Sequence, residues 1–535
     1  MSQRRNAVEG SGLVLLVLAS GQFLMTLDSS VMNVSIASVA KDVGTDVTGI
    51  QTAITLYTLV MASLMITGGK IGTLLGRRRA FGIGLMIYAA GSLTTALAPN
   101  LPVLLFGWSF LEGVGAALIM PAIVALVAGN FPPERRAATY GTIAAAGAMA
   151  VAAGPLIGGA VTTFFSWRYV FVGEVIVVFA ILMVLRRVRD APVGERTPLD
   201  LVGVALSIAG LAMTVFGVLR SGEWGWVQPK PDAPELFGIS PVLWLVLGGL
   251  LIVYLFLRWE AHVVEAGREP LVRPSMLQNK RLTGGLTMFF FQFMVQAGAF
   301  FAIPLFLSVV LELSALETGA RLVPLSIALL ITAAGVPKVF PHASPRRVVR
   351  LGLLFALAGT VVLVGGLDLS ADASVVAVPL ILIGLGIGAL SSQLGAITVS
   401  AVPDDESAEV GGLQNTLTNL GASLGTALIG SILIAGLTAA FIQGVQDNPD
   451  IPQDLKTRAS VELAGGIPFI SDTDLKAGLA DSDVPPQVQQ EVLNENAAAR
   501  LNGLQDALSV VAIIIVLALF FTGRLPSRPV GAKPG

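Results

Sequence analysis

The chain has 535 residues, of which 54% are hydrophobic and 13% charged, with a formal net charge of −2 and no cysteine. Soluble domains carry about twice that share of charged residues, so the composition excludes a soluble globular protein and a disordered one. The missing cysteines exclude disulfides and thiolate metal sites, and the near-neutral charge gives no reason to expect nucleic acid as a partner.

Fourteen stretches have the roughly 20 mostly apolar residues that a membrane-crossing helix needs. They lie near residues 12–36, 49–68, 80–98, 101–129, 138–162, 166–187, 200–219, 240–258, 284–311, 318–338, 348–367, 374–400, 408–440 and 502–522. Their spacing predicts an N-terminal six-helix bundle (1–187), two extra spans with polar linkers (188–283) and a C-terminal six-helix bundle (284–535). Most of the 33 lysine and arginine residues fall on the side of the N-terminus, so we expect both termini in the cytoplasm.

Three carboxylates lie inside predicted spans of the first bundle, where charged groups are costly and usually functional. The helical rise places Glu112 about 17 Å and Glu174 about 12 Å below the outer starts of their spans, and Asp28 nearer the outside. Because a buried carboxylate can hold a proton or a cation, all three are candidate proton-coupling residues. The alternatives are local hydrogen bonds to Asp28 from the serines that follow it, and pairing of Glu174 with Arg168.

Two glycine-containing segments are candidates for structural or gating roles. In the loop from residue 69 to 79, the spacing G-x-x-x-x-x-x-G-R-R-R predicts a tight turn anchored by arginines. In the fifth span, a G-x-x-x-G face allows close helix packing, and a proline bends the helix. Tight packing alone is the alternative for that span. The candidate residues are Gly69, Gly72, Gly76, Arg77, Arg78, Gly147, Gly154, Pro155, Gly158 and Gly159, together with Arg168 at the start of the sixth span.

The second bundle offers neutral polar residues among phenylalanines. Gln292 and Gln296 share one helix face, and phenylalanines surround them between residues 289 and 301. An apolar, aromatic pocket with a few polar anchors suits a hydrophobic or cationic ligand, although such a run can also face lipid. The predicted substrate cavity comprises Asn33, Ser109, Gln292, Gln296, Gln393, Asn415 and Asn419.

Segment 441–500 is acidic and rich in proline, and the predicted topology places it outside. It is either a solvated loop that caps one bundle, or a lid or partner-binding surface. The sequence has no P-loop, catalytic triad or metal-ligand spacing, so we expect neither an enzyme nor a bound metal or cofactor.

Four motifs in order resemble those of the major facilitator superfamily. The loop 69–79 resembles its signature loop, Leu27–Val34 its span-one drug-exporter motif, and Gly147 with 154–159 its antiporter motif. Ser166–Phe171 and the six-two-six layout are similar to its fourteen-span drug:proton antiporters, over essentially the whole chain. The resemblance implies an all-α membrane protein with the major facilitator fold, and in the family the antiporter motif is thought to prevent leak.

The resemblance also implies a function. It predicts an exporter of lipophilic, cationic compounds across the cytoplasmic membrane, driven by the proton gradient through alternating access. The expected partners are the lipid bilayer, a small hydrophobic or cationic substrate and protons, and the protein is expected to work as a single chain. The alternatives are export of one dedicated metabolite or lipid, a different coupling, and a non-transporting membrane sensor.

Two positions depart from the family pattern. The signature loop usually carries an aspartate where this chain has Thr73, and the fourth span usually carries an arginine where it has Ser109. In the family, that aspartate is associated with a charge latch and that arginine with proton handling. The proton path here must therefore use other groups, or the coupling differs.

Overall fold

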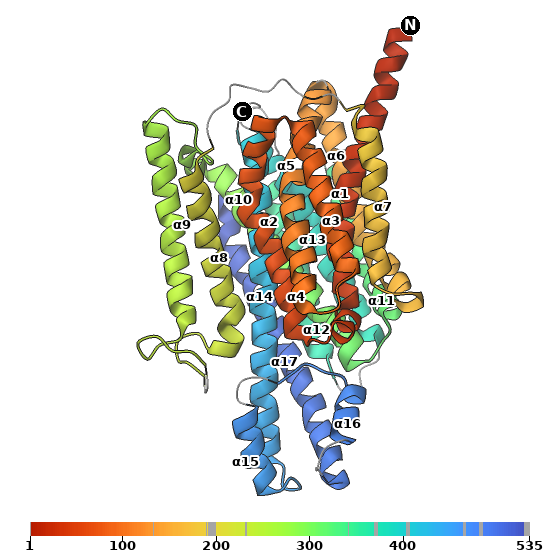
Figure 1. The fold of residues 1–535 in the computed structure, drawn as a ribbon, viewed down its shortest axis with the longest axis vertical. Helices are drawn as coiled ribbons and strands as arrows, with labels where there is room; N and C mark the ends of the chain where they lie inside the picture. Colours follow the sequence, from red (N-terminus) through yellow and green to blue (C-terminus); the bar gives the residue numbers. More distant parts are fainter. Residues whose placement is uncertain are drawn as a thin grey trace.

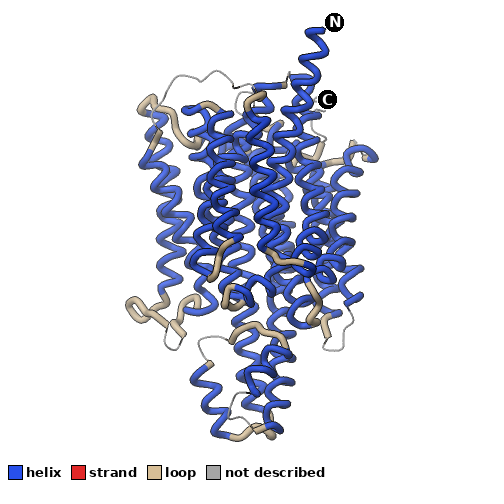
Figure 2. The backbone as a smooth tube through the Cα atoms, turned by 45° about the vertical axis from the view of Figure 1, so that its right-hand side comes forward, coloured by secondary structure: helices blue, strands red, loops and turns tan. Residues whose placement is uncertain are grey.

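The computed structural model describes residues 2–131, 133–188, 190, 199–230, 233–340, 342–368, 373–402, 407–463, 467–480 and 485–528. Long helices run side by side along one axis (Figure 1), and no strand occurs in these ranges (Figure 2). Helices satisfy every backbone hydrogen bond within one segment, which a chain of this hydropathy needs in lipid. The all-α fold predicted from the sequence is confirmed.

The first half of the chain forms one bundle. Its helices are α1 (Ser2–Asp42), α2 (Val47–Leu75), α3 (Arg77–Ala96), α4 (Leu101–Leu104), the π-helical η1 (Leu105–Glu112), α5 (Gly113–Asn130), α6 (Pro133–Phe164) and α7 (Arg168–Leu185). The α4, η1 and α5 segments follow one another without a break, so together they form one long span.

The remainder of the chain forms the other bundle and the helices between the two. They are α8 (Leu201–Trp224), α9 (Pro241–Glu265), η2 (Pro274–Gln278), α10 (Lys280–Leu305), η3 (Phe306–Val310), α11 (Ala315–Val339), α12 (Pro345–Gly366), η4 (Ala373–Val376), α13 (Ala377–Val399), α14 (Ser407–Asp447), α15 (Gln453–Glu462), α16 (Asp472–Ala480), α17 (Pro486–Phe521) and η6 (Thr522–Arg524). Buried apolar residues of both bundles form one continuous core.

Polar side chains mark where several helices begin. The Asp46 carboxylate accepts a hydrogen bond from the Gly49 N–H (2.8 Å) at the start of α2. Ser314 and Glu317 form a reciprocal capping box at the start of α11. Such caps satisfy backbone N–H groups that have no partner within the helix, so they fix where the chain turns back.

Twelve helices within the described ranges are long and apolar enough to span a membrane, and α6, bent by 41° between Val151 and Ala153, would be a thirteenth. The predicted stretch 80–98 corresponds to α3, which begins with three arginines and ends in small and hydroxyl residues, and it is not among those spans. The prediction of fourteen spans is thus close but not confirmed.

Helices α8 and α9 pack against each other at one side of the molecule (Figure 1). Their contact with the remainder runs mainly through α8, where the Ser431 hydroxyl of α14 donates to the Leu219 carbonyl (3.1 Å). Gly222 of α8 allows this approach, because a methyl group there would lie 3.0 Å from the Ser431 carbonyl oxygen.

Helix α1 begins and α17 ends at one end of the molecule, here called the terminal end (Figure 1). At the opposite end, here called the far end, α14 and α17 extend beyond the bundles and carry α15 and α16. With 41 residues, α14 is about 60 Å long, about twice the thickness of the hydrocarbon core. Segment 441–500 is therefore largely helical where it is described.

The two bundles contact one another toward the far end. The Leu316 N–H of α11 donates to the Thr163 hydroxyl of α6 (3.0 Å), close to where α6 ends and α11 begins. On the other side of the molecule, the Gln51 amide of α2 donates to the Ala427 carbonyl of α14 (3.0 Å), and the Ser423 hydroxyl donates to the Thr55 carbonyl (2.9 Å). Two seams thus join the bundles in the same half of the molecule.

Candidate functional site

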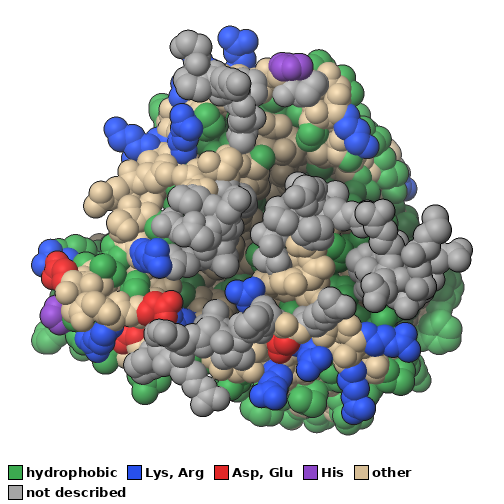
Figure 3. Space-filling view, turned by 90° about the horizontal axis from the view of Figure 1, so that it is seen from above, with side chains coloured by type: hydrophobic (Ala, Val, Ile, Leu, Met, Phe, Trp, Pro, Cys, Tyr) green, Lys and Arg blue, Asp and Glu red, His purple; other side chains and the backbone are tan. Residues whose placement is uncertain are grey.

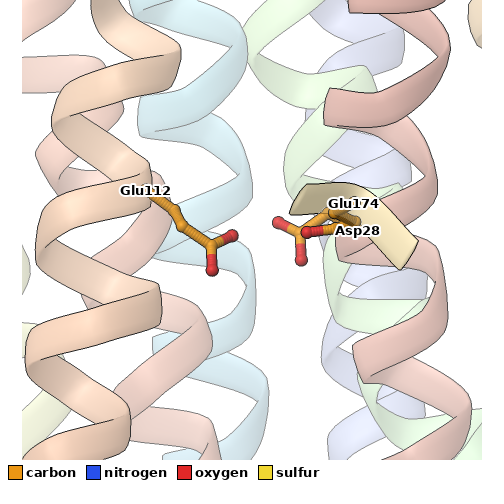
Figure 4. A group of neighbouring side chains, drawn as sticks. All are labelled: Asp28, Glu112 and Glu174. Atoms are coloured by element: carbon orange, nitrogen blue, oxygen red, sulfur yellow. The ribbon is translucent and has the colours of Figure 1, made fainter. Parts of the chain in front are cut away.

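Asp28 of α1, Glu112 at the end of η1 and Glu174 of α7 lie together inside the first bundle (Figure 4). One carboxylate oxygen from each lies within 4.8 Å of the others, and all three residues are at most 2% exposed. In Figure 4, the Glu112 side chain points across the bundle toward the other two. These three residues are called the carboxylate cluster below.

Asp28 is held by an aromatic pair rather than by its neighbours in sequence. The indole N–H of Trp108 lies 2.8 Å and 3.0 Å from the two Asp28 oxygens. The Trp108 ring stacks on Tyr57 of α2 with the ring centroids 5.0 Å apart. The predicted alternative, local bonding to the following serines, is not what the structure shows, because the donor comes from η1.

Glu112 occupies the last position of the π-helical stretch, a geometry that is frequent at functional sites because it shifts the direction of the side chains. The side chain fits only because Gly91 of α3 has no side chain: a methyl group there would lie 2.6 Å from the Glu112 Cγ. Its Oε1 lies 3.1 Å from the Thr95 hydroxyl. Its Oε2 is buried without a hydrogen-bond partner.

Glu174 reaches the cluster from α7. Its Oε2 accepts hydrogen bonds from the hydroxyls of Tyr88 (3.2 Å) and Ser92 (3.1 Å) on α3, and its Oε1 is buried without a partner. The alternative of a Glu174–Arg168 pair is wrong. Arg168 instead forms an ion pair with Asp42 at the end of α1 and donates to the Ala98 carbonyl (2.5 Å).

No lysine, arginine or histidine of the described residues forms an ion pair with the cluster. The other titratable groups that act on it are the hydroxyls of Tyr57 and Tyr88. Three acidic groups without a basic partner in a buried site must be neutralised by protons or by a bound cation. The arrangement can therefore exchange one for the other, and it has the ligand type that a metal ion would need.

The predicted cavity residues are not all brought together. Asn33 lines a small cavity between α1, α6, α10 and α11, next to Pro155 and Phe300. Ser109 is buried and donates to the Ala53 carbonyl (2.8 Å), so it joins η1 to α2.

In the second bundle, the predicted residues bond to polar groups of the same bundle. The Gln292 amide donates to the Ser391 hydroxyl (2.8 Å), linking α10 to α13, and the Gln292 Oε1 is buried without a partner. Gln393 donates to the adjacent Ser392 hydroxyl (3.2 Å), and the Asn419 amide donates to the Asn415 carbonyl (2.9 Å). Gln296, one turn after Gln292 on α10, is only partly buried.

Segment 69–79, predicted as a loop, instead forms the end of α2 and the start of α3 with Gly76 alone between them, because the turn needs one residue only; contacts that the sequence did not reveal hold this junction. The Arg78 N–H donates to the Asp190 carboxylate (3.1 Å) beyond α7, and the Arg77 guanidinium donates to the Ala125 carbonyl (3.1 Å) of α5. Lys70 forms an ion pair with Glu269 (2.5 Å) in the linker after α9. Asp190 thus supplies a carboxylate at this junction. The side chain of Thr73, where the family has its aspartate, lies outside the described residues.

The backbone conformation at position 76 requires glycine. It has φ of 94°, and a methyl group there would lie 2.8 Å from the Asp190 Oδ2. Replacing Gly76 with alanine should therefore lower the stability of the purified protein by about 1–3 kcal/mol, seen as a lower apparent Tm in detergent. Gly395→Ala, where a methyl group meets nothing within 4 Å, is the matched control. Equal Tm values for the two variants would contradict this account.

Gly72 and Gly69 are less constrained. A methyl group at Gly72 would lie 3.9 Å from Ala80, and one at Gly69 would lie 3.5 Å from Pro121, both ordinary contact distances. The neighbouring Gly68, which the motif does not include, packs directly against the Ala117 carbonyl of α5. The close approach of α2 and α5 therefore depends on Gly68.

Helix α6 uses its small residues on two faces. Gly147, Gly154 and Gly158 face α1, where methyl groups at Gly147 and Gly158 would lie 3.3 Å from Gln22 and 2.8 Å from Val31. Gly159 faces α11 of the other bundle, against the Ala315 backbone.

Pro155 also takes part in the contact between the bundles. Its carbonyl packs against Gly319 of α11. Because proline lacks an N–H, the Val151 carbonyl one turn earlier loses its usual donor. The Ser326 hydroxyl of α11 donates to that carbonyl instead (3.3 Å). The carbonyl that the bend in α6 leaves without a helical donor therefore accepts a hydrogen bond from the opposite bundle.

A buried arginine binds the part of the chain that carries α15 and α16, residues 448–480, here called the far-end segment. Arg500 of α17 is 1% exposed; its guanidinium forms an ion pair with Asp472 at the start of α16 and donates to the carbonyls of Ile470 (2.7 Å) and Val309 (3.3 Å). Glu312, between η3 and α11, accepts bonds from the backbone N–H (2.9 Å) and hydroxyl (2.7 Å) of Thr473. Although burial opposes it, these bonds and the Arg500 charge lower the pKa of Glu312.

The same segment also reaches the first bundle, through an ion pair between Lys41 of α1 and Asp474 of α16 (3.5 Å). Both partners of this pair are largely exposed. The segment therefore contacts both bundles, whereas the first alternative from the sequence was a solvated loop that caps one bundle.

Two helical bundles of membrane-spanning length, the first with three buried carboxylates, are the architecture of a membrane transport protein. The sequence matches the family described as Major Facilitator Superfamily over residues 18–426. The chain belongs to this family, and the predicted resemblance is confirmed.

Proteins of known name with similar sequences include drug-resistance and export proteins of actinobacteria. The chain is 29% identical to the puromycin resistance protein of Streptomyces alboniger, over 80% of this chain and 82% of that one. It is 27% identical to the probable actinorhodin transporter of Streptomyces coelicolor, over 84% and 75%. It is 25% identical to the multidrug efflux pump LfrA of Mycolicibacterium smegmatis, over 96% and 95%.

Solved structures with the same fold include transporters of low sequence identity. A peptide transporter, POT, in complex with sulfate superposes with a TM-score of 0.58 at 15% identity, covering 96% of each chain. A bacterial homologue of the human lysosomal transporter Spinster, in an inward-facing and unoccupied conformation, gives a TM-score of 0.56 at 15% identity, covering 98% and 99%. These likenesses bear on the fold alone.

Proposed function

We propose that the protein exports lipophilic, cationic compounds across the cytoplasmic membrane in exchange for protons, by alternating access of a central site. The observation that carries the proposal is the carboxylate cluster, because its three buried acids have no basic partner among the described residues. Such a site must take up protons when it gives up a cation, and competition between the two is the simplest basis of antiport.

We further propose that the terminal end faces the cytoplasm. Lys and Arg side chains are spread around this face (Figure 3), in line with the positive-inside rule. The contacts between the bundles at α6–α11 and α2–α14 then close the route to the outside.

The relatives support export of drugs or antibiotics but leave two candidates for the substrate range. The efflux pump LfrA is named for multidrug export, whereas the actinorhodin transporter is named for a single compound. Since LfrA is similar over 96% of this chain and 95% of its own, we favour a broad range of lipophilic cations over one dedicated metabolite.

The test uses everted membrane vesicles with an inside-acid pH gradient, monitored by a fluorescent weak base. Adding ethidium should dissipate part of the gradient, because each ethidium that enters the lumen is exchanged for protons that leave it. Vesicles without the protein are the blank, and vesicles with the exposed-carboxylate variant Glu235→Gln should behave like the wild type. Ethidium accumulation that leaves the pH gradient unchanged would refute proton antiport.

A further inference from the structure

We propose that the carboxylate cluster is a two-proton store that exchanges protons for substrate charge one for one. In its substrate-free state it holds protons on Glu112 and Glu174, while Asp28 carries the single negative charge. A monocation then displaces one proton and a dication displaces two. This inference rests on the proposed function, and it adds the charge classes of substrate and the number of protons that each displaces.

The number of protons follows from the distances. Three carboxylate oxygens, one per residue, lie within 4.8 Å of one another at buried positions. Like charges this close in a low-dielectric site cannot all be present together, so each carboxylate beyond the first retains a proton. No cationic side chain of the described residues acts on the three, and the groups that face them from α2 and α3 are the Tyr57 and Tyr88 hydroxyls.

Hydrogen bonding identifies Asp28 as the charged member. The Trp108 indole N–H can only donate, and it lies within 3.0 Å of both Asp28 oxygens. A donor shared between both oxygens stabilises the ionised form. The stacking of Trp108 on Tyr57 keeps the donor in place.

Hydrogen bonding also identifies Glu112 as a neutral member. The Thr95 hydroxyl has one hydrogen, and its two neighbours are the Gly91 carbonyl at 2.9 Å and the Glu112 Oε1 at 3.1 Å. Both neighbours can accept, so the single Thr95 hydrogen is shared between them, and the Glu112 carboxyl has at most this one shared donor among the described residues. The other oxygen, Oε2, has no partner, which is far less costly for a neutral acid than for a carboxylate.

Glu174 is the second neutral member. Among the residues that the structure describes, its Oε1 is buried without a partner, and its donors are two hydroxyls on Oε2. One of these, Ser92, also lies 3.2 Å from the Tyr88 carbonyl, so its single hydrogen serves two acceptors. An ionised carboxylate has about four acceptor positions to fill, and Glu174 is supplied with one or two.

The exchange balances in charge and atoms. With two protons, the cluster has a net charge of −1. Binding of a monocation and loss of one proton leave that net charge unchanged, and so do binding of a dication and loss of both protons. No bond other than O–H is formed or broken, and the protons leave to water.

The experiment counts protons released by the purified full-length protein in weakly buffered detergent solution. Ethidium is the monocation and propidium, which adds a quaternary ammonium arm to the same ring system, is the dication. Saturating ethidium should release one proton per protein and propidium two, with occupancy measured in parallel by dye fluorescence.

Two single variants sharpen the test. Glu112→Gln and Glu174→Gln each remove one stored proton, so either variant should release one proton with either dye. If a variant fails to fold, the ratio of protons released by the wild type with propidium and with ethidium still tests the proposal. One proton for both dyes in the wild type would overturn the two-proton store and leave proton antiport standing. Binding of both dyes with no proton released would overturn both proposals.

Discussion

Replacing Asp28 with asparagine is expected to abolish ethidium-driven proton movement in everted vesicles, down to the level of vesicles without the protein. Asp28 is the member of the cluster whose two oxygens both lie next to a group that can only donate, the Trp108 N–H at 2.8 Å and 3.0 Å. An amide at this position cannot carry the negative charge that attracts a cation. The measurement is the initial rate of gradient dissipation per amount of protein in the membrane.

The fold should survive this loss of function. Asp28→Asn removes a buried charge that has no basic partner among the described residues, and Glu112→Gln replaces a neutral acid with a neutral amide, so the apparent Tm of both variants should equal or exceed that of the wild type. Glu235→Gln, an exposed carboxylate in the loop before α9, controls for the loss of one acid and should change neither rate nor Tm. A normal rate in the Asp28→Asn variant would remove Asp28 from the coupling site.

Replacing Arg500 with alanine should detach the far-end segment. The guanidinium is buried, pairs with Asp472 and donates to the carbonyls of Ile470 and Val309. Loss of hydrogen bonds to a charged group and exposure of their acceptors should cost about 2–3 kcal/mol. We expect faster backbone amide exchange in residues 467–480 and in η3, with a lower apparent Tm.

Lys41 provides the matched control, because it also joins a basic side chain to α16. The Lys41–Asp474 pair is largely exposed, so Lys41→Ala should change stability by no more than about 1 kcal/mol. If Arg500→Ala exchanged amides in 467–480 no faster than Lys41→Ala, Arg500 would not be what holds the segment.

The fold was largely predictable because apolar length decides where helices lie in a membrane protein. The count of spans was less certain at α3 and α6. Helix α3 mixes arginines, glycines and hydroxyl residues, and α6 bends between Val151 and Ala153. Hydropathy also could not show that α14 and α17 continue past the bundle, because their outer parts are polar.

The sequence predicts each of the three acids as a candidate site residue, but it does not predict that they lie together in one cluster. The sequence predicts Asp28 nearer the outside because the apolar stretch of the first span ends at residue 36. In the structure α1 runs on to Asp42, so Asp28 lies about 21 Å before its far end, close to the depth of Glu112 at about 17 Å from Leu101. The donor Trp108 was missed because bonds between helices leave no spacing signal.

The junction of α2 and α3 at residues 69–79 is a second feature whose contacts the sequence does not predict. Thr73 stands where the family has an aspartate, and the sequence offered no substitute. In the structure, Asp190 supplies a carboxylate to the Arg78 N–H from beyond the end of α7. A contact of this kind depends on how α3 and α7 pack, which residue order alone does not give.

The most direct test of proton–cation competition at the cluster is the Kd of ethidium for the purified protein between pH 6 and 9. If one proton is displaced per ethidium, the Kd should fall about tenfold for each pH unit over the range in which that proton is bound. The triple variant Asp28→Asn, Glu112→Gln, Glu174→Gln should bind ethidium weakly and without this dependence. A wild-type Kd that does not change with pH, or a triple variant that keeps the wild-type slope, would contradict the assignment of coupling to these three carboxylates.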